Sequence, residues 1–363
     1  MLRVCGITFV RTTNYGTCFQ AYALQKAIDG ITVGNGVKCQ CEFVPLWRCK
    51  DHFSNKQSTF FYSHFFRFFK RFQEDGIRYA DCKSIRELPS LNQEYDAFVC
   101  GSDVIWNPVF NRRLGLYYLD FANKYKFSYA PSFGKANIED PFLNEAGRWI
   151  SELAEISVRE PSAVEIVKEY AGREAQVVTD PVLLLAPDEW KRITEIRRDT
   201  GRYIFSYTTH STSEYEQFLR KLSKQTGLKV IRAVWVRGTK AALKQKRIMI
   251  QSPEKWLSQL CGAEYVVTNS FHATVFSSML HKKFFTVVHG EKDEGSNIRM
   301  YDYLKATGLQ DRMYCSIPET IDLSDVDFSG SDDSIHEMRE KGLAFLRENL
   351  EAAWKEKNRE KTP

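Results

Sequence analysis

Strand-like and helix-like segments alternate along most of this chain, and that alternation is the feature that most limits its fold. The first run, residues 1–9, is apolar and β-branched, which predicts a buried strand. A polar loop containing a glycine then leads into good helix formers over residues 18–28. Strand, loop and helix in this order begin a doubly wound sheet, and the N-terminus of such a helix is a natural anion site. Further strands are expected at 41–46, 97–100, 126–130, 156–158 and 177–178, and helices at 141–153 and 162–170.

A second alternating series begins near Tyr203, after a segment at 180–187 that has a proline near each end. The prolines predict a crossing between two domains. One helix start in this series is clear, because Ser252 is a good cap residue and is followed by a proline and then an acidic residue. The strands expected here are 203–207, 229–234, 264–268 and 283–288, and further helices are expected at 213–226 and 273–280.

The order of these segments predicts an α/β fold with mostly parallel sheets, because the intervening helices cover the faces of each sheet. At 363 residues the chain also exceeds the size at which single cores usually stop growing. We therefore expect two Rossmann-like domains facing a cleft, at residues 1–186 and 187–330. The tail, residues 331–363, contains one charged amphipathic helix in a position to brace both lobes.

The amino-acid composition limits the cellular compartment and the binding partners that we expect for this protein. Lys and Arg number 51 against 46 Asp and Glu, and the formal charge of +5 would suit an anionic substrate or an acidic membrane surface. No nucleic-acid motif accompanies this charge, so nucleic-acid binding is not expected. The nine cysteines are odd in number and irregularly spaced, which indicates free thiols in a reducing compartment. The cluster of Cys39, Cys41 and Cys49 lacks the paired spacing of a zinc site, so no metal is expected.

The N-terminal apolar run is too short for a signal peptide, and no apolar stretch approaches the length of a membrane span. These features predict a cytoplasmic protein. An aromatic and basic insertion at about 51–80 also bears on location, and its residues 60–72 carry four phenylalanines on one helical face: Phe61, Phe65, Phe68 and Phe72. We favour packing of this face on the N-terminal domain or in a dimer interface. The alternative is peripheral contact with the inner face of a membrane.

Six short motifs follow one another along the chain. They are Asn14-Tyr15-Gly16-Thr17, then residues 101–108 (GSDVIWNP), 128–134 (SYAPSFG), 157–160 (SVRE), 179–181 (TDP) and 268–274 (TNSFHAT). In this order they resemble the polysaccharide pyruvyl transferase family, and the resemblance covers most of the chain. It implies a two-lobed fold like that of the GT-B glycosyltransferases, with phosphoenolpyruvate bound in the cleft. Two positions depart from the family pattern: Thr17 stands where many members have an acidic residue, and Ala273 where many have a glycine.

The resemblance implies transfer of pyruvate from phosphoenolpyruvate to a pair of sugar hydroxyls as a cyclic ketal, in surface or capsular polysaccharide biosynthesis. The acceptor would be a sugar or a lipid-linked oligosaccharide, and no cofactor is expected besides phosphoenolpyruvate as co-substrate. Such a reaction protonates the vinyl carbon of the donor, adds one hydroxyl, releases phosphate and closes with a second hydroxyl. The protein must therefore neutralise a phosphate and a carboxylate, deliver a proton and hold two hydroxyls near one carbon.

Arg159 and His272 are the leading candidates for this chemistry. Arg159 follows a predicted strand, where clefts of open α/β sheets lie, and the family pattern implies a donor-binding arginine there. Its alternative role is a surface ion pair with Glu160. His272 lies in a strand-to-helix turn, where it would exchange a proton or contact the leaving phosphate, and its alternative is helix capping. Lys282 and Arg299 would add positive charge facing the donor, although a lysine before a strand is often simply solvated.

The remaining candidates come from the other motifs. Asp103 would orient acceptor hydroxyls or act as a base, with turn capping as its alternative. Trp106 is expected to stack on the acceptor sugar unless it fills the core. Tyr15 is assigned to the acceptor and Asn14 to the donor, both through the first loop. Ser270 would assist His272 through its hydroxyl.

Two other functions fit the same architecture. One is a glycosyltransferase with a nucleotide-sugar donor, which fold alone does not separate from a pyruvyl transferase. The donor that raises the melting temperature distinguishes these two, because a ligand that binds only the native state stabilises it. The other is a non-catalytic sugar-binding or assembly protein, which would be favoured if His272→Ala and Arg159→Ala left function intact.

Overall fold

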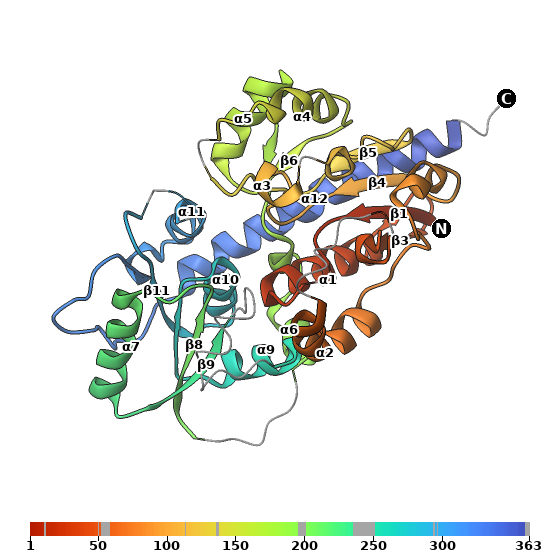
Figure 1. Ribbon diagram of the computed structural model, residues 1–363. Coiled ribbons are helices and arrows are strands. Elements are labelled where there is room, and N and C mark those ends of the chain that lie inside the picture. Colours follow the sequence, from red (N-terminus) through yellow and green to blue (C-terminus); the bar gives the residue numbers. More distant parts are fainter. Residues whose placement is uncertain are drawn as a thin grey trace.

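The computed structural model describes residues 1–10, 12–49, 51, 59–112, 114–135, 138–194, 201–234, 251–292, 295 and 297–359. The described chain forms two lobes, each built on a five-stranded sheet, and a long C-terminal helix runs along both (Figure 1). The N-terminal sheet has the order β2-β3-β1-β4-β5, and its pairs are parallel except β2–β3. Its strands are β1 (Leu2–Ile7), β2 (Thr32–Val33), β3 (Val37–Phe43), β4 (Ala97–Cys100) and β5 (Tyr125–Ser128).

The central strands of this sheet, β1 and β4, are buried along almost their whole length, as expected where both faces of a parallel sheet are covered. A small parallel pair, β6 (Ser157–Val158) and β7 (Gln176–Val177), lies beside β5 and is joined to it by a bridge between Phe127 and Glu155. The helices of this lobe are α1 (Tyr15–Asp29), η1 (Leu46–Arg48), α2 (Thr59–Gly76), η3 (Ile85–Gln93), α3 (Pro108–Asn111), η4 (Gly115–Tyr118), α4 (Phe142–Ser151) and α5 (Pro161–Ala171).

The C-terminal sheet has the order β12-β11-β10-β8-β9, and all of its described pairs are parallel. Its strands are β8 (Tyr203–Thr208), β9 (Lys229–Val234), β10 (Tyr265–Thr268), β11 (Lys283–Val287) and β12 (Met313–Tyr314). Around them lie η5 (Pro181–Leu183), α6 (Pro187–Arg192), α7 (Ser213–Thr226), α9 (Pro253–Gly262), α10 (Phe271–Met279), α11 (Ile298–Ala306) and η6 (Gln310–Arg312). Together the two sheets confirm the predicted α/β class with mostly parallel strands.

The two lobes share an apolar core on one side of the boundary between them. Tyr15 and Phe19 of α1 pack with Trp256 of α9, and the rings of Tyr15 and Trp256 stack with their centroids 5.2 Å apart. The Tyr15 hydroxyl also lies 3.3 Å from both the backbone N and O of Gln251. Burying large aromatic side chains in this way stabilises the contact between the lobes. The lobes are therefore held together by packing as well as by the crossing segment.

The described side chains of α2 show where part of the aromatic and basic insertion packs. Phe69 and Phe72 are buried in the shared core, with Phe69 against Tyr15 at 4.9 Å between ring centroids, while Lys70 and Arg71 are exposed. Of the predicted face, Phe72 is buried and Phe68 is half-buried against the same shared core, whereas the buried Phe69 is not part of that predicted face. The side chains of residues 60–65 lie outside the described residues.

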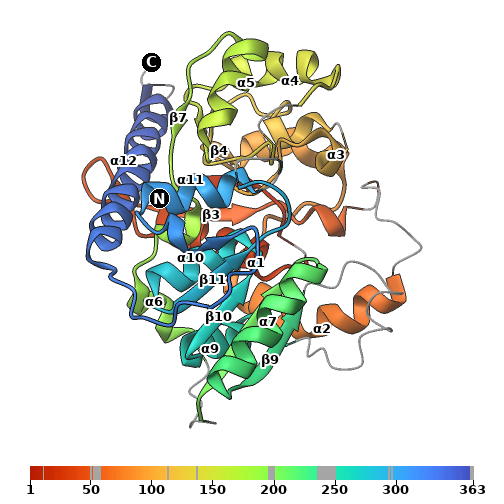
Figure 2. The same ribbon diagram turned by 90° about the vertical axis from the view of Figure 1, so that its left-hand side faces the viewer.

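The last helix, α12 (Ser329–Arg359), contacts both lobes (Figures 1 and 2). Near its start Ile335 packs in the core that the two lobes share, and near its middle Phe345 packs against Tyr129 of the N-terminal lobe. Between them, Arg339 Nε donates to the carbonyl of Leu183 in the crossing segment at 2.8 Å. The helix therefore links the sheets and the crossing segment in one packed arrangement.

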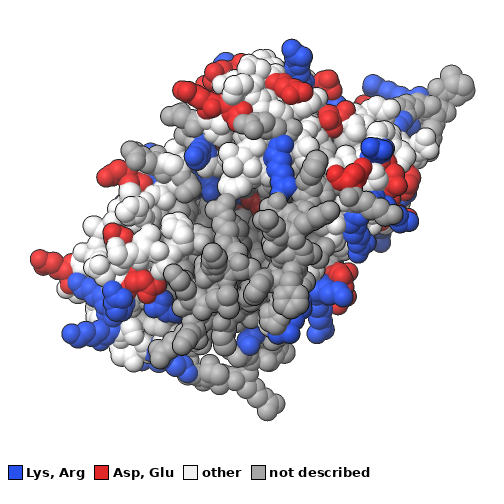
Figure 3. Space-filling model, viewed as in Figure 1, with Lys and Arg blue, Asp and Glu red and all other residues white. Residues whose placement is uncertain are grey.

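Acidic and basic side chains are interspersed over the described surface that Figure 3 shows. In the part of the chain that the structure describes, no helix combines the length and the apolar character needed to span a membrane. Seven cysteines are buried free thiols, as expected: Cys5, Cys18, Cys39, Cys41, Cys49, Cys82 and Cys100. Among the described residues, no group of three or more His, Cys, Asp or Glu side chains is arranged to hold a metal ion.

Candidate active site

A cavity of about 330 Å³ opens between the lobes, beside the carboxyl end of β6 and against α12. Segments that are far apart in sequence form its wall. Arg159 and Glu160 come from the end of β6, Phe271 and Arg299 from the C-terminal lobe, and Lys341 from α12. Because ligands of open α/β sheets bind outside the carboxyl ends of the strands, a small ligand is expected here.

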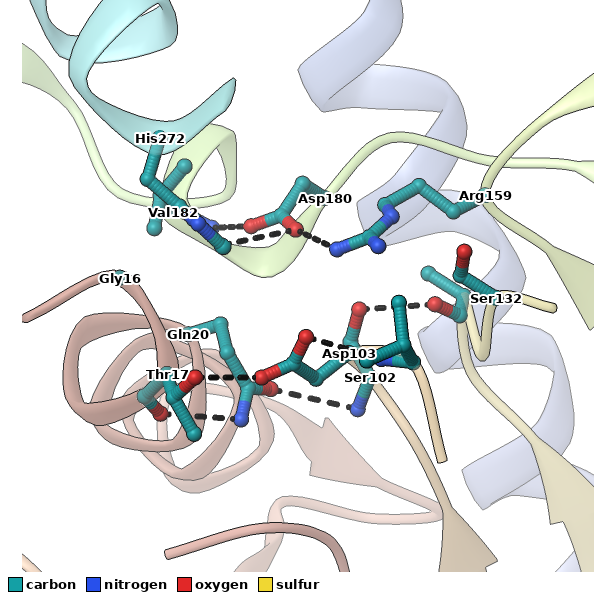
Figure 4. Close-up of polar contacts among 12 residues, drawn as sticks. Gly16, Thr17, Gln20, Ser102, Asp103, Ser132, Arg159, Asp180, Val182 and His272 are labelled. Carbon is teal, nitrogen blue, oxygen red and sulfur yellow. Dashed lines mark hydrogen bonds and ion pairs between the residues drawn. The ribbon is translucent and has the colours of Figure 1, made fainter. Parts of the chain in front are cut away.

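Two carboxylates hold Arg159 in this wall. The Arg159 side chain is 3% exposed, its Nη1 donates to Asp180 Oδ2 at 2.8 Å, and its Nε lies 3.8 Å from Glu160 Oε2. His272 approaches the same Asp180 oxygen from the other side, with its Nε2 at 3.4 Å (Figure 4). Burial alone would raise the pKa of Asp180, yet His272, Arg159 and the Val182 backbone N–H hold that pKa well below its ordinary value. A charged carboxylate therefore joins the two leading candidates.

Both cavity arginines keep N–H groups that no described group satisfies. Arg159 Nε and Nη2 and Arg299 Nε are buried and have no hydrogen-bond partner in the described structure. Burial, and then the neighbouring charge of Arg159, lower the pKa of Arg299 to about 10. Unpaired buried donors and two like charges in one cavity are both unfavourable. An anion bound between the guanidinium groups would relieve both penalties, so this wall is suited to an anionic ligand.

His272 is positioned by a close approach between two helix N-termini. It lies in the first turn of α10, and Gly16 lies in the first turn of α1. A Cβ atom at Gly16 would fall 2.1 Å from His272 Nδ1, so a glycine is required for this contact. Asn14 caps α1, because its Oδ1 accepts from the Gly16 backbone N–H at 3.0 Å. The first loop therefore supports the histidine from the opposite lobe.

Gly16→Ala is expected to lower any activity that depends on His272 by at least about tenfold, because the new methyl group must displace the imidazole from its place beside Asp180. Alanine is otherwise the better helix former by about 1 kcal/mol, so a loss of helix propensity would not explain the result. Gly30→Ala at the other end of α1 is the matched control, since a Cβ there has its closest contact at 3.4 Å. Full activity of Gly16→Ala would show that His272 functions equally well in another position.

Asp103 lies beneath the Asp180–Arg159 pair (Figure 4). Its backbone is left-handed, with φ at 72°, and both carboxylate oxygens are engaged by the chain. Thr17 Oγ1 donates to Oδ2 at 2.6 Å, and the Val104 N–H donates to Oδ1 at 2.8 Å. Gln20 extends this network by accepting from the Ser102 N–H at 3.3 Å. The negative charge of Asp103 favours the charged forms of both cavity arginines. Asp103 therefore helps to keep this wall of the cavity positively charged.

The structure does not bring Trp106 and Tyr15 to an accessible surface. Trp106 is fully buried, its ring stacks on Tyr118 at 5.7 Å, and its Nε1 donates to the carbonyl of Tyr117. Tyr15 is also fully buried, within the core that the lobes share. Neither ring offers a face to a sugar, so the expected acceptor contacts are corrected to packing roles, because aromatic neighbours cover both rings.

Two other expected donor ligands occupy different positions. Lys282 lies beyond the carboxyl end of α10, the end opposite His272, where its Nζ donates to the carbonyl of Cys261 at 2.8 Å. Lys282 therefore does not line the cavity with Arg159 and Arg299. Ser270 is the residue before α10, is buried, and donates its N–H to Thr268 Oγ1 at 3.0 Å. It stands next to the site without lining the cavity.

Several charged side chains that line the cavity, Glu337 among them, have no site role predicted from the sequence. Asp180 lies in a recognised motif, yet only the folded chain shows that it joins Arg159 to His272. Glu160 was considered only as a partner for Arg159. Asp302 and Lys341 line the cavity from α11 and α12. For these two no motif was available, and the signal would have been their charge on helices expected to reach the cleft.

Comparison with known proteins tests the family resemblance. The sequence profile described as polysaccharide pyruvyl transferase matches residues 14–291. No sequence among the curated proteins matches the chain significantly.

Three solved structures illustrate the structural neighbours. The MnaA–UDP complex of S. aureus superposes with 10% identity over 97% of this chain and 91% of that one, at a TM-score of 0.48. UDP-N-acetylglucosamine 2-epimerase from Rickettsia bellii has 12% identity over 99% and 95% of the chains, at 0.47. The E. coli heptosyltransferase WaaC with ADP has 13% identity over 94% and 100%, at 0.38. The profile match covers most of the sequence and confirms the resemblance carried by the motifs, so this chain belongs to the polysaccharide pyruvyl transferase family.

Proposed function

We propose that this protein transfers pyruvate from phosphoenolpyruvate to two hydroxyls of a sugar as a cyclic ketal. The observation that carries the proposal is that two arginines in one cavity keep buried N–H groups without a described partner: Nε and Nη2 of Arg159 and Nε of Arg299. The Asp180–His272 pair adjoins them. The cavity volume of about 330 Å³ is ample for a small doubly anionic donor and part of a sugar.

The two arginines would hold the charged groups of phosphoenolpyruvate. A guanidinium offers N–H donors in a planar fork that matches carboxylate and phosphate oxygens. Arg159 is fixed by Asp180 and lies over the Phe271 ring at 5.1 Å, so its unpaired Nε and Nη2 are held in a defined direction. Arg299 contributes Nε from the opposite lobe. Donor binding would therefore bring the two lobes into contact with one ligand.

His272 would deliver the proton that the vinyl carbon receives. Its Nε2 faces the Asp180 carboxylate at 3.4 Å without a well-formed hydrogen bond, so no strong partner holds this nitrogen. Protonation makes the adjacent carbon electrophilic, a sugar hydroxyl adds to it, phosphate leaves and the second hydroxyl closes the ring. The arginines stabilise the departing phosphate through the same N–H groups that bind the donor.

The test combines binding with turnover. Phosphoenolpyruvate should raise the melting temperature of the full chain, and phosphate should be released when a galactose, mannose, glucose or N-acetylhexosamine acceptor is added. A nucleotide sugar that stabilises the protein when phosphoenolpyruvate does not would favour the glycosyltransferase alternative. A folded protein that responds to millimolar phosphoenolpyruvate in neither experiment contradicts the proposal.

Arg299→Lys is expected to raise KM for phosphoenolpyruvate by about 10- to 100-fold, since an ammonium keeps the charge but loses the planar fork. Steady-state kinetics of phosphate release measure the change. Lys305→Ala, an exposed position on the same helix, is the control and should leave KM unchanged. Equal KM values for Arg299→Lys and the wild type would remove Arg299 from the donor site.

A further inference from the structure

Glu160 presents a buried carboxylate oxygen to the cavity without a donor to satisfy it. Its side chain is 3% exposed and lines the cavity between the lobes. Oε1 accepts from Ser132 Oγ at 2.7 Å, Phe133 N at 3.1 Å and Gly134 N at 3.4 Å, which fixes the plane of the carboxylate. Oε2 has no hydrogen-bond partner in the described structure, and Arg159 Nε lies 3.8 Å away, beyond hydrogen-bond distance.

An acceptor oxygen left unpaired in a buried site is costly, so a donor is expected to reach it when the site is filled. Phosphoenolpyruvate does not supply that donor at neutral pH. Its carboxylate and phosphate present acceptor oxygens, and their negative charge is repelled by Glu160. A hydroxyl of the acceptor sugar has the required O–H group.

Three further carboxyl groups line the same cavity: Asp302, Glu337 and Asp180, the last of which is paired with Arg159. Asp302 lies one turn after Arg299 on α11, and burial, followed by the charge of Glu160, raises the pKa of Asp302. A cavity made for a doubly charged anion alone would be lined by cations. Carboxyl groups mixed with cationic side chains in one cavity suit two ligands together, one an anion and the other a polyol.

We propose that Glu160 is the base that takes the proton of the first acceptor hydroxyl, and that donor and acceptor share this cavity. The inference rests on the proposed pyruvyl transfer. As the sugar oxygen forms its bond to C2 of the pyruvyl group, its O–H bond breaks and the proton passes to Glu160 Oε2. The bond between C2 and the phosphate oxygen then breaks and its electron pair leaves with phosphate. The second hydroxyl closes the ketal at C2, its O–H bond breaks, and its proton passes to the departing phosphate. The proton gained by C3 comes from His272, so each group has one role.

Glu160→Gln tests this assignment in the full chain. The amide oxygen can keep the three contacts of Oε1, but the other end becomes a donor and no longer accepts a proton. We expect kcat for phosphate release with phosphoenolpyruvate and the sugar acceptor to fall by at least about 100-fold. The rise in melting temperature with phosphoenolpyruvate should be kept or enlarged, because a negative charge beside Arg159 is removed. Glu165→Gln, an exposed carboxyl on α5, is the matched control and should behave as the wild type.

The possible results separate the two proposals. A wild type that neither binds phosphoenolpyruvate nor releases phosphate overturns the proposed function, and this inference with it. An active wild type with a Glu160→Gln variant that keeps kcat within a few fold overturns the inference alone. Loss of both turnover and the response to phosphoenolpyruvate also overturns it, because Glu160 would then act only by holding Arg159.

Ser132→Ala provides a second variant if Glu160→Gln does not fold. It removes the 2.7 Å contact to Oε1 and leaves the carboxylate itself in place. We expect kcat to fall by about tenfold with the phosphoenolpyruvate response unchanged, since Glu160 is less well oriented. Unchanged kcat in this variant contradicts a requirement for an oriented Glu160.

Discussion

His272→Asn is expected to lower kcat for pyruvyl transfer by about 10²- to 10⁴-fold, the range that a positioned proton donor contributes. An asparagine side chain can occupy the space between Gly16 and Asp180 but carries no exchangeable proton of suitable acidity. Phosphoenolpyruvate should still raise the melting temperature, because Arg159 and Arg299 remain. Parallel measurement of phosphate release and of the donor-dependent melting temperature therefore separates loss of chemistry from loss of binding.

His281→Asn is the matched control for that variant. His281 follows α10 at the end opposite His272, its side chain is 52% exposed, and it has a left-handed backbone that asparagine adopts readily. Its ion pair with Asp332 is a surface contact of small expected value. If both variants keep wild-type kcat, proton delivery belongs to another group and the assignment of His272 is wrong.

Local sequence signals predicted much of the fold. The observed β4, β9 and α7 have the predicted bounds, because each is a run with one periodicity and clear ends. In α7, Thr212 caps the helix and Gly227 ends it in a left-handed conformation. The predicted start at Ser252 is also confirmed, since its side chain accepts from the Lys255 N–H. Signals of this kind act within a few residues and need no tertiary partner.

Strand starts were less predictable. The strand expected at 41–46 is β3 at Val37–Phe43, because alternating half-buried residues before Cys41 pair with β1 and β2 and extend it backward. That pairing partner is set by the sheet order, which local propensity does not encode. The short strands β2 and β12 were not predicted for the same reason.

Most errors in the predicted site concern whether a side chain is exposed or buried. Trp106 and Tyr15 belong to distinctive motifs, but a motif does not show which aromatic rings the fold will cover. Glu160 shows the opposite case, because a carboxylate beside an arginine suggests a surface pair and only the packed turn at Ser132 reveals its unfilled oxygen. Arg159 and His272, by contrast, follow strand ends, where the topology of parallel sheets places ligands. The predicted strand ends therefore indicated where the cavity lies. Which side chains face it depends on how the folded chain packs.

Arg159→Met is expected to abolish the response of the melting temperature to phosphoenolpyruvate and to lower the free energy of unfolding by about 3–5 kcal/mol. Methionine fills the space of the arginine stem but leaves Asp180 buried without its guanidinium partner. Chemical denaturation with and without phosphoenolpyruvate measures both effects. Arg347→Met on α12, where the side chain is 53% exposed, is the control and should change neither.

The pH dependence of stability gives that variant a further signature. In the wild type the lowered pKa of Asp180 contributes stability above the ordinary carboxyl pKa, and this contribution is lost as pH falls through the folded-state value. Removing Arg159 raises the pKa of Asp180, so the variant loses part of the contribution at neutral pH. The stability gap to the wild type should therefore be largest near neutral pH and narrow below about pH 4, where an ordinary carboxyl group is protonated.

A double variant separates the stability effect of Arg159 from its donor role. Arg159→Met combined with Asp180→Asn removes the uncompensated charge, so most of the lost stability should return. The response to phosphoenolpyruvate should stay absent, because the unpaired Nε and Nη2 donors are still missing. A double variant that binds phosphoenolpyruvate as the wild type does would show that Arg159 is a structural partner of Asp180 and that the donor is held elsewhere.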